Sequence, residues 1–411
     1  MMMAEIIADF QRNWILYLMI PFISGFIGWI TKVIAVKMMF GPLEFKGIWW
    51  IGWQGVVPRK AEKMATTAVE LMTSKLIKPE EIFARLDPKR IAQEIEAPMM
   101  AAAEEITREV AQRYQPGLWE AIPEAARQRI IKRVKAESPA VVAQIMTEIQ
   151  KDVTGYFDIK HMVITNLTRD KTLLNDIFKK VGKQEFRFFG WIGLIFGLVV
   201  GVVQMLLWLV FKEPWLLPLF GGIVGFTSDW LALYLMFRPQ HPKKIMGFTV
   251  QGMFLKRQQQ VATDYADLIS KQLLTPANMM EELFRGQMSD RIMDLVHKNV
   301  KRMVDEQAGI AKPLVVYALG GDRYIEMKEV IAEKILSKLP ETMKHMEAYA
   351  ADAMDIRNTL VERMRKLTPE EFEGMLRPAF QEDEKTLIIV GGVLGVVVGE
   401  MQVLLMLPLF K

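Results

Sequence analysis

The chain has 411 residues, of which 51% are hydrophobic and 24% charged, with 52 Lys and Arg against 48 Asp and Glu. The absence of cysteine excludes disulfides, cysteine-ligated zinc and thiol catalysis, and the four histidines have no metal-ligand spacing. The net charge of +4 is dispersed along the chain and gives no support to nucleic-acid binding. Together, the apolar and charged fractions indicate apolar segments that alternate with charged ones.

Residues 14–40 are predicted to form the first membrane helix. The stretch Trp14–Thr31 is almost entirely apolar, and about 20 such residues cross a bilayer. We expect Pro21 to kink this helix. The acidic start, with Glu5 and Asp9, and the lack of a cleavage site indicate a membrane anchor rather than a signal peptide.

An elbow in the membrane interface is predicted to follow, as far as residue 58. Its sequence places Trp49, Trp50 and Trp53 among glycines, directly before a basic pair. Tryptophan prefers the headgroup region of a bilayer, so these three residues are predicted to be interfacial anchors.

Residues 59–185 are predicted to form a first helical domain. Helix starts with proline in the first turn are expected at Pro79, Asp87–Pro88 and Ser138–Pro139. Apolar residues recur at helical spacing, and we interpret these stripes as core packing. The stripes are Met64, Ala68, Leu71, Met72 and Leu76, then Ile130, Ile131 and Val134, and in the following helix Val141, Ile145 and Ile149.

Three further membrane helices and a second helical domain complete the chain. Residues 188–211 carry no charge, whereas the other two segments each contain an acidic residue, Asp229 and Glu400. The predicted order is a membrane helix at 188–211, a membrane helix at 215–237 with an elbow to 255, a helical domain at 256–385 that includes a helix start at Thr368–Pro369, and a membrane helix at 386–410.

Glycines recur at four-residue spacing in two of the membrane segments. Such small-residue ridges let helices approach closely, and we interpret them as helix-packing surfaces; a gate or pore lining is the alternative. The ridges are Gly193, Gly197 and Gly201, and Gly391, Gly395 and Gly399.

A shift of 197 residues aligns the two halves of the chain. It places Gly28 on Gly225 and Pro42 on Pro239, and many further matches follow. The sequence therefore predicts a tandem duplication: an all-α membrane protein with four transmembrane helices in two parallel pseudo-symmetric repeats, each of which carries a long cytoplasmic helical domain.

The predicted orientation follows from the basic residues. Many Lys and Arg flank the side that carries the helical domains, whereas the opposite side has only Arg12, Lys212 and Lys411. The positive-inside rule then places both domains in the cytoplasm and both termini in the periplasm or outside the cell.

Several motifs resemble the DUF445 family of bacterial membrane proteins. The first half contains "TKVIAVKMMFGP", "QGVVPRK" and "GLIFGLVVGVVQ", and the second contains "SDWLALYLMFRP" and "QGMFLKR". The resemblance implies a multi-pass protein of the bacterial inner membrane with no assigned activity. Where the family motif has Asn, this chain has Lys32 and Asp229, and Leu255 replaces the proline of the second elbow.

Charges inside the membrane segments carry the main hypothesis about a site. Lys32, Asp229 and Glu400 each interrupt an apolar run, at a cost of at least about 2.5 kcal/mol each. We interpret them as a charge cluster that locks the two halves together, and an ion or proton path is the alternative. In the lock, Lys32 meets Asp229, Glu400 or both.

We find no motif for a catalytic, cofactor or metal site, and the sequence predicts a non-enzymatic protein. The function expected is an envelope-associated scaffold, or a protein that binds lipid or a protein partner through its helical domains while the lipid bilayer holds its membrane helices. The alternative is a transporter or channel built on the four-helix membrane core. The oligomeric state stays open.

Overall fold

The computed structural model describes residues 2–49, 51–121, 123–245, 247–309, 312–377 and 384–406. The chain divides into two compact units. We call residues 1–68, 167–265 and 361–411 the membrane unit, and residues 69–166 and 266–360 the helical unit. Each unit therefore draws on both halves of the sequence. The helical unit combines the middle parts of both predicted helical domains.

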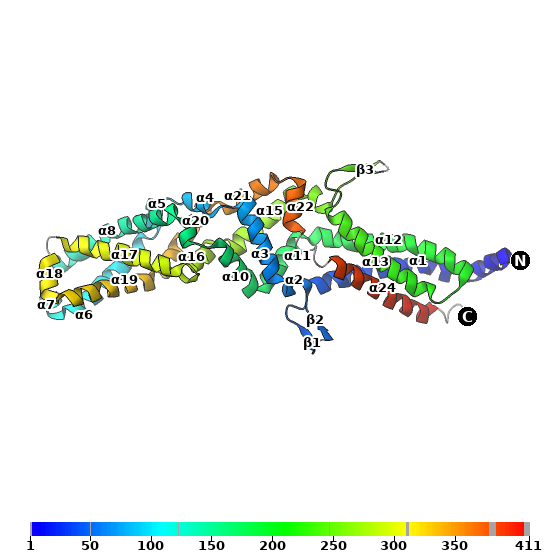
Figure 1. Ribbon diagram of the computed structural model, residues 1–411, viewed down its shortest axis with the longest axis horizontal. Helices are drawn as coiled ribbons and strands as arrows, with labels where there is room; N and C mark the ends of the chain where they lie inside the picture. The colour runs from blue at the N-terminus through cyan, green and yellow to red at the C-terminus, as the bar shows by residue number, and fades with distance from the viewer. Residues whose placement is uncertain are drawn as a thin grey trace. The chain divides into compact units, whose positions relative to one another are not determined.

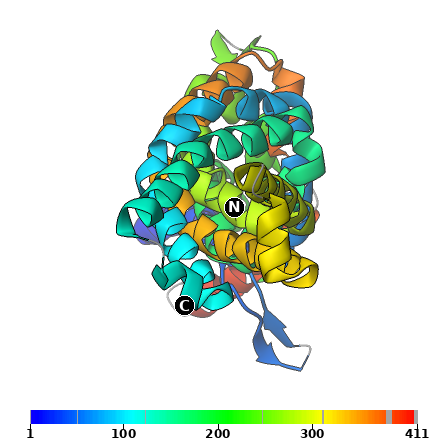
Figure 2. The same ribbon diagram turned by 90° about the vertical axis from the view of Figure 1, so that its left-hand side faces the viewer.

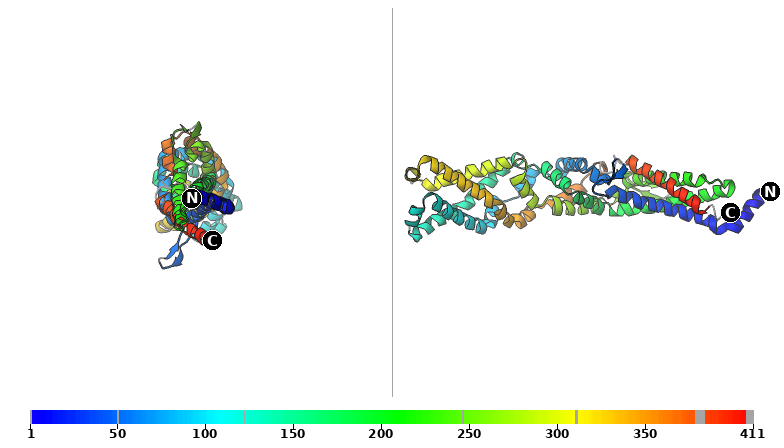
Figure 3. Two further views of the ribbon diagram at one scale, coloured as in Figure 1. Left: turned by 90° about the vertical axis from the view of Figure 1, so that its right-hand side faces the viewer. Right: turned by 90° about the horizontal axis from the view of Figure 1, so that it is seen from below.

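Among the described residues of the membrane unit, four helices are long and apolar enough to cross a membrane. They are α1 (Met2–Phe40), α12 (Lys183–Phe211), α13 (Leu216–Phe237) and α24 (Glu384–Met406). Figure 3 shows them side by side, with α1 packed along α12, α13 along α24, and α12 against α13. Each half of the chain thus contributes one pair of packed helices to the membrane unit: α1 with α12, and α13 with α24.

Within α1, the backbone leaves helical dihedrals at Asn13 (φ −118°, ψ 25°) rather than at Pro21. The Asn13 side chain donates a hydrogen bond to Asp9, at 3.0 Å. Asparagine side chains commonly form such local bonds, which compete with a regular helix.

Two short antiparallel hairpins occupy the predicted elbows. Strand β1 (Lys46–Ile48) pairs with β2 (Ile51–Trp53), and β3 (Lys243–Ile245) pairs with β4 (Phe248–Val250). The structure is predominantly helical, as the sequence predicts, but these hairpins correct the all-α assignment. Strands of three residues are too short for alternation to reveal them.

The membrane unit also contains short helices that follow the hairpins and precede α12 and α24. They are α2 (Val56–Arg59), α11 (Lys171–Val181), α14 (Met253–Lys256) and α22 (Pro369–Leu376). Four helices carry the chain from one unit to the other: α3 (Ala61–Leu71), α10 (Ile159–Arg169), α15 (Gln258–Leu268) and α21 (Ile356–Arg365).

The helical unit is built around four longer helices, α6 (Glu96–Tyr114), α8 (Glu124–Lys151), α17 (Ser289–Ala308) and α19 (Gly321–Met343) (Figure 1). Helix α6 packs against α8 and α19, and α17 packs against α8 and α19. The shorter elements are η1 (Met72–Leu76), α4 (Pro79–Ala84), α5 (Pro88–Glu94), α7 (Pro116–Ala121), α9 (Val153–Tyr156), η2 (Ile269–Leu273), α16 (Pro276–Arg285), α18 (Lys312–Leu319), η4 (Lys344–Met346) and α20 (Glu347–Met354).

Three of the predicted helix starts are confirmed. Helices α4, α5 and α22 begin at Pro79, Pro88 and Pro369. In α5 the Asp87 carboxylate accepts a hydrogen bond from the Lys89 amide, and in α22 Thr368 forms a capping box with Glu371.

The fourth predicted start is wrong, because Ser138 and Pro139 lie inside the continuous helix α8. The Ser138 hydroxyl donates to the carbonyl of Val134, one turn earlier, at 2.8 Å. It therefore supports the helix already present instead of capping a new one.

Matching elements of the two halves share one offset. Strands β1 and β3, strands β2 and β4, helices α2 and α14, helices α3 and α15, and the π-helical turns η1 and η2 each begin 197 residues apart. The offset that aligns the two halves of the sequence therefore also relates their local structure through both hairpins and into the first helices that follow.

Candidate functional sites

Lys32 and Asp229 form an ion pair inside the membrane unit. Lys32 lies on α1 and Asp229 on α13, and the Lys32 Nζ atom is 2.6 Å from Asp229 Oδ1. Both side chains are 0% exposed. The structure thus brings together two charges that lie 197 residues apart in the sequence.

Glycines provide the space for this pair. A Cβ atom on Gly193 would lie 2.8 Å from Lys32 Cγ, and one on Gly391 would lie 1.6 Å from Asp229 Oδ2. Any larger residue at either position would occupy the volume of a charged side chain. The first glycine of each ridge therefore also shapes the charge site.

The pair is only partly satisfied by hydrogen bonds. Lys32 Nζ is 3.4 Å from the Gly225 carbonyl, to which it donates, and 5.8 Å from the centre of the Phe189 ring. Asp229 Oδ2 receives no hydrogen bond from any residue that the structure describes. A lone charge at this depth would be costly, so each charge depends on the other for stabilisation.

Glu400 does not join the pair, which corrects the predicted three-residue cluster. Its side chain is exposed on α24. Gly391 of the same helix is level with Asp229, and Glu400 lies nine residues further along. That separation is about 13.5 Å at helical rise, longer than a lysine side chain.

The glycine ridges lie at the contacts within each helix pair, α1 with α12 and α13 with α24. Cβ atoms on Gly197 and Gly201 would lie 2.4 Å from the Ser24 carbonyl oxygen and 2.6 Å from Pro21 Cα on α1. Cβ atoms on Gly395 and Gly399 would lie 2.1 Å from the Gly221 carbonyl oxygen and 2.5 Å from Pro218 Cα on α13. The ridge of α12 therefore packs on α1 and that of α24 packs on α13, with backbones nearly in contact.

Other buried polar contacts in this unit were not found from the sequence. Ser24 donates to Gln204 Oε1 at 2.7 Å between α1 and α12. Near the other end of α12, the fully buried Glu185 meets Arg257, at 2.5 Å. The signals were present as isolated polar residues in or beside apolar runs, but a single sequence does not show which partners they meet.

Two of the three predicted interfacial tryptophans, Trp49 and Trp53, belong to the first hairpin. Trp49 lies at its turn and is 82% exposed. Trp53 is partly buried, and its indole nitrogen donates to the Met38 carbonyl at 3.0 Å. Trp50 lies outside the described residues.

The helical unit contains an apolar cavity of about 390 Å³. Helices α6 and α8 of the first half and α17 and α19 of the second half contribute most of its wall. The lining is almost entirely aliphatic, aromatic and methionine side chains. The methionines are Met99, Met146, Met280, Met303, Met327 and Met343.

The cavity corrects the interpretation of one predicted core stripe. Of the α8 residues expected in the core, Ile131 and Ile149 are buried, as predicted. Ile130, Val134, Val141 and Ile145 are not buried and line the cavity, as Ile149 also does. Helical periodicity identifies the apolar face of α8, but it does not show whether the space opposite that face is filled. Met64, Met72 and Leu76, from the earlier stripe, are buried.

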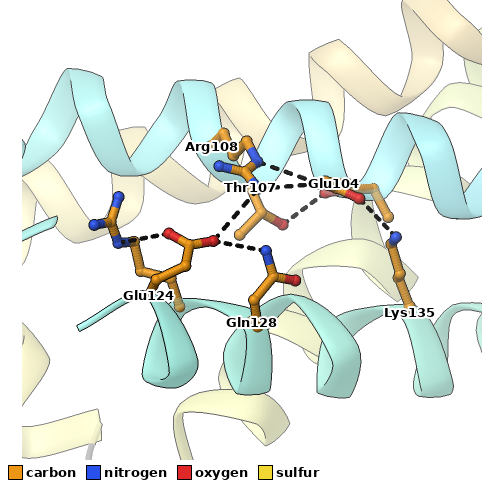
Figure 4. Close-up of polar contacts among 8 residues, drawn as sticks. Glu104, Thr107, Arg108, Glu124, Gln128 and Lys135 are labelled. Carbon is orange, nitrogen blue, oxygen red and sulfur yellow. Dashed lines mark hydrogen bonds and ion pairs between the residues drawn. The ribbon is translucent and has the colours of Figure 1, made fainter. Parts of the chain in front are cut away.

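Ion pairs on the outer surface tie the cavity wall together. Glu104 of α6 accepts hydrogen bonds from Lys135 of α8 at 2.7 Å and from Arg108 at 3.1 Å (Figure 4). These bonds, that from Lys135 foremost, lower the pKa of the Glu104 carboxyl below its usual value. Lys338 of α19 likewise meets Glu105 of α6 at 2.8 Å, which connects the two halves of the unit.

Among the described residues, no group of three or more His, Asp or Glu side chains could hold a metal ion. The buried Lys32–Asp229 pair and the apolar cavity are thus two candidate functional sites among the described residues.

Comparisons with known proteins identify membrane proteins. The chain is 24% identical over 121 residues to the UPF0754 membrane protein of Staphylococcus epidermidis, covering 29% of this chain and 31% of that protein. It is 27% identical over 93 residues to the protein of the same name from Staphylococcus aureus (22% and 25%) and 24% identical over 118 residues to that of Staphylococcus haemolyticus (28% and 30%).

The chain therefore aligns with less than a third of the length of these curated relatives. No family model matches the chain, and no solved structure matches it. Together with the four apolar helices, the relatives define a multi-pass integral membrane protein. They support a likeness to UPF0754 membrane proteins, and the DUF445 resemblance stays a prediction.

Proposed function

We propose that this protein is a non-enzymatic lipid-binding protein of the bacterial inner membrane. The membrane unit anchors the protein in the bilayer, and the apolar cavity of the helical unit binds the acyl chain of a lipid. The observation that carries this proposal is the cavity itself. Its volume of about 390 Å³ lies within the range of about 300–1,000 Å³ typical of ligand sites.

The chemistry of the cavity wall supports an aliphatic occupant. Acyl chains require apolar contact without hydrogen bonds, and the lining supplies it. Methionine side chains are flexible and polarizable, so a wall with six of them can adapt to chains of different length and shape. Protein interiors are close-packed with few voids, so a volume of this size in the helical unit favours an occupant.

The shared 197-residue offset supports a tandem duplication as the origin of the architecture. In this proposal, the two halves are parallel repeats about an axis along the membrane normal, and the basic residues place both helical domains in the cytoplasm. The cavity, whose wall comes from both halves, would then be a product of the fusion.

In the same proposal, the Lys32–Asp229 pair is a structural lock. Both side chains are fully buried and each neutralises the other. The alternative, a transporter or channel, would use this pair on an ion path. The missing hydrogen bond at Asp229 Oδ2 favours that alternative, since an ion or proton could supply the contact.

The lipid proposal is tested by native mass spectrometry and lipid extraction of the protein purified from its membrane. We expect bound lipid at a defined stoichiometry. Ala102→Phe on α6 fills the cavity and should remove this lipid, whereas Ala101→Phe, one residue earlier and exposed, should not. Equal lipid in the folded parent and the folded Ala102→Phe variant would contradict the proposal.

A further inference from the structure

The hairpin β1–β2 exposes a large apolar surface at its tip. Ile48 is 81% exposed and Trp49 82% exposed, and Phe45 beside them is more than half exposed. Figures 1 and 2 show that the hairpin stands clear of the membrane helices from which it projects. A surface hairpin in water would carry polar residues at these positions.

The turn of this hairpin is also unfavourable for its residue type. Trp49 has φ 57°, in the left-handed region that bulky residues rarely adopt. In the second hairpin, the described turn residue is Gly247, which has φ 85° and is a residue type that adopts positive φ readily. A bulky aromatic residue in this strained conformation at an exposed turn points to a role for its side chain.

The base of the hairpin is fixed to the end of the first membrane helix. Trp53 of β2 donates to the carbonyl of Met38, in the last turn of α1. Gly55 packs on the same helix end, since a Cβ on it would lie 2.6 Å from the Gly41 nitrogen. The hairpin is therefore held directly at the end of the first membrane helix.

We propose that the tip of β1–β2 inserts into the interface of the bilayer that α1 spans, with Ile48 and Trp49 among the lipid headgroups and Lys46 toward the phosphates. Tryptophan favours this region, and a lysine stem can extend from apolar to polar surroundings. The lipid surface then covers the exposed apolar residues. This inference concerns the membrane unit and does not depend on the lipid cavity.

The second hairpin provides a built-in comparison. It has the same register at an offset of 197 residues, but Lys243 and Lys244 occupy the positions of Lys46 and Gly47. Its turn contains Gly247 and no tryptophan. We infer that Lys244, which is exposed, remains in water.

Because the chain has no cysteine, single labels can test this placement. Ile48→Cys and Lys244→Cys are each labelled with an environment-sensitive fluorophore and reconstituted in lipid nanodiscs. Iodide in the water quenches the fluorescence of a label that is exposed to water, and a nitroxide attached to lipid quenches a label that lies in the membrane interface. We expect the label at 48 to be quenched several-fold less by iodide than the label at 244, and more by the lipid nitroxide.

A further variant separates the role of Trp49 from that of the hairpin. Trp49→Gly tolerates the positive φ, so the turn is kept, and in the Ile48→Cys background it should raise iodide quenching toward the value at 244. The proposal is overturned if iodide quenches both positions equally, if both positions lie in the interface, or if Trp49→Gly leaves the label at 48 unchanged.

Discussion

The stability of Lys32 and Asp229 depends on their being together. Neither side chain reaches water, and the described contacts leave one carboxylate oxygen without a hydrogen bond. Removal of one partner would leave the other as an uncompensated charge in an apolar surrounding, which is more costly than removal of both.

We predict that Lys32→Met or Asp229→Leu alone lowers the free energy of unfolding by about 3–5 kcal/mol, as for other broken buried pairs. The double variant should recover most of this loss, because no charge is left unpaired. Thermal unfolding in detergent, followed by helical circular dichroism, measures the cycle.

Glu400→Gln is the matched control, because its side chain is exposed and outside the pair. It should cause no loss of stability. Additive effects of Lys32→Met and Asp229→Leu would refute the lock, and unchanged stability with a loss of ion flux in proteoliposomes would favour the transporter.

At the scale of the elements, the glycine ridges determine how closely the membrane helices pack. On α24, Gly395 opposes the Gly221 backbone, whereas a Cβ atom on Gly392 would lie 3.5 Å from its nearest neighbour, Phe226 Cβ, at ordinary contact distance. The two glycines lie three residues apart in the same helix, but only one of them is at the close contact.

We predict that Gly197→Leu and Gly395→Leu destabilise the membrane unit, because each new side chain would overlap backbone atoms of the opposing helix. A decrease in the unfolding midpoint in detergent measures this effect. Gly392→Leu changes the same helix by the same side chain and should be tolerated. A similar midpoint for Gly395→Leu and the parent would show that close packing at this ridge is unimportant.

At the scale of the whole molecule, the orientation in the membrane follows from the proposal that each half crosses twice. The loop at Glu213 then lies on the side opposite to the helical domains. Glu137 and Lys366 lie in the two halves of the sequence, and all three side chains are exposed.

We predict that Glu213→Cys is labelled by an impermeant maleimide in intact cells. Glu137→Cys and Lys366→Cys should be labelled only after permeabilisation, because the positive-inside rule places them in the cytoplasm. Labelling of Glu137→Cys but not Lys366→Cys in intact cells would show that the halves are not parallel, and the reverse of the whole pattern would invert the topology.

The sequence by itself determined the features that depend on local pattern. A long apolar run specifies a membrane helix because the bilayer selects on length and hydropathy alone. A capping residue followed directly by proline specified the starts of α5 and α22. This signal is also local, because the hydrogen bonds of a cap form within one helical turn. Ser138–Pro139 shows the limit, because the same residues can also lie within a helix.

Only the tertiary structure decided which distant residues meet. From their positions along the membrane helices, Lys32 could have reached Asp229 or Glu400. In the structure, Gly391 of α24 lies beside Asp229, and Glu400 lies about 13.5 Å further along the same helix, so Lys32 pairs with Asp229. The stripe on α8 could have been core or wall, and the volume between α6, α8, α17 and α19 made most of it a wall, while Ile131 lies in the core. Periodicity fixes the face that a helix presents, whereas the space and the partner opposite that face depend on contacts between segments far apart in the chain.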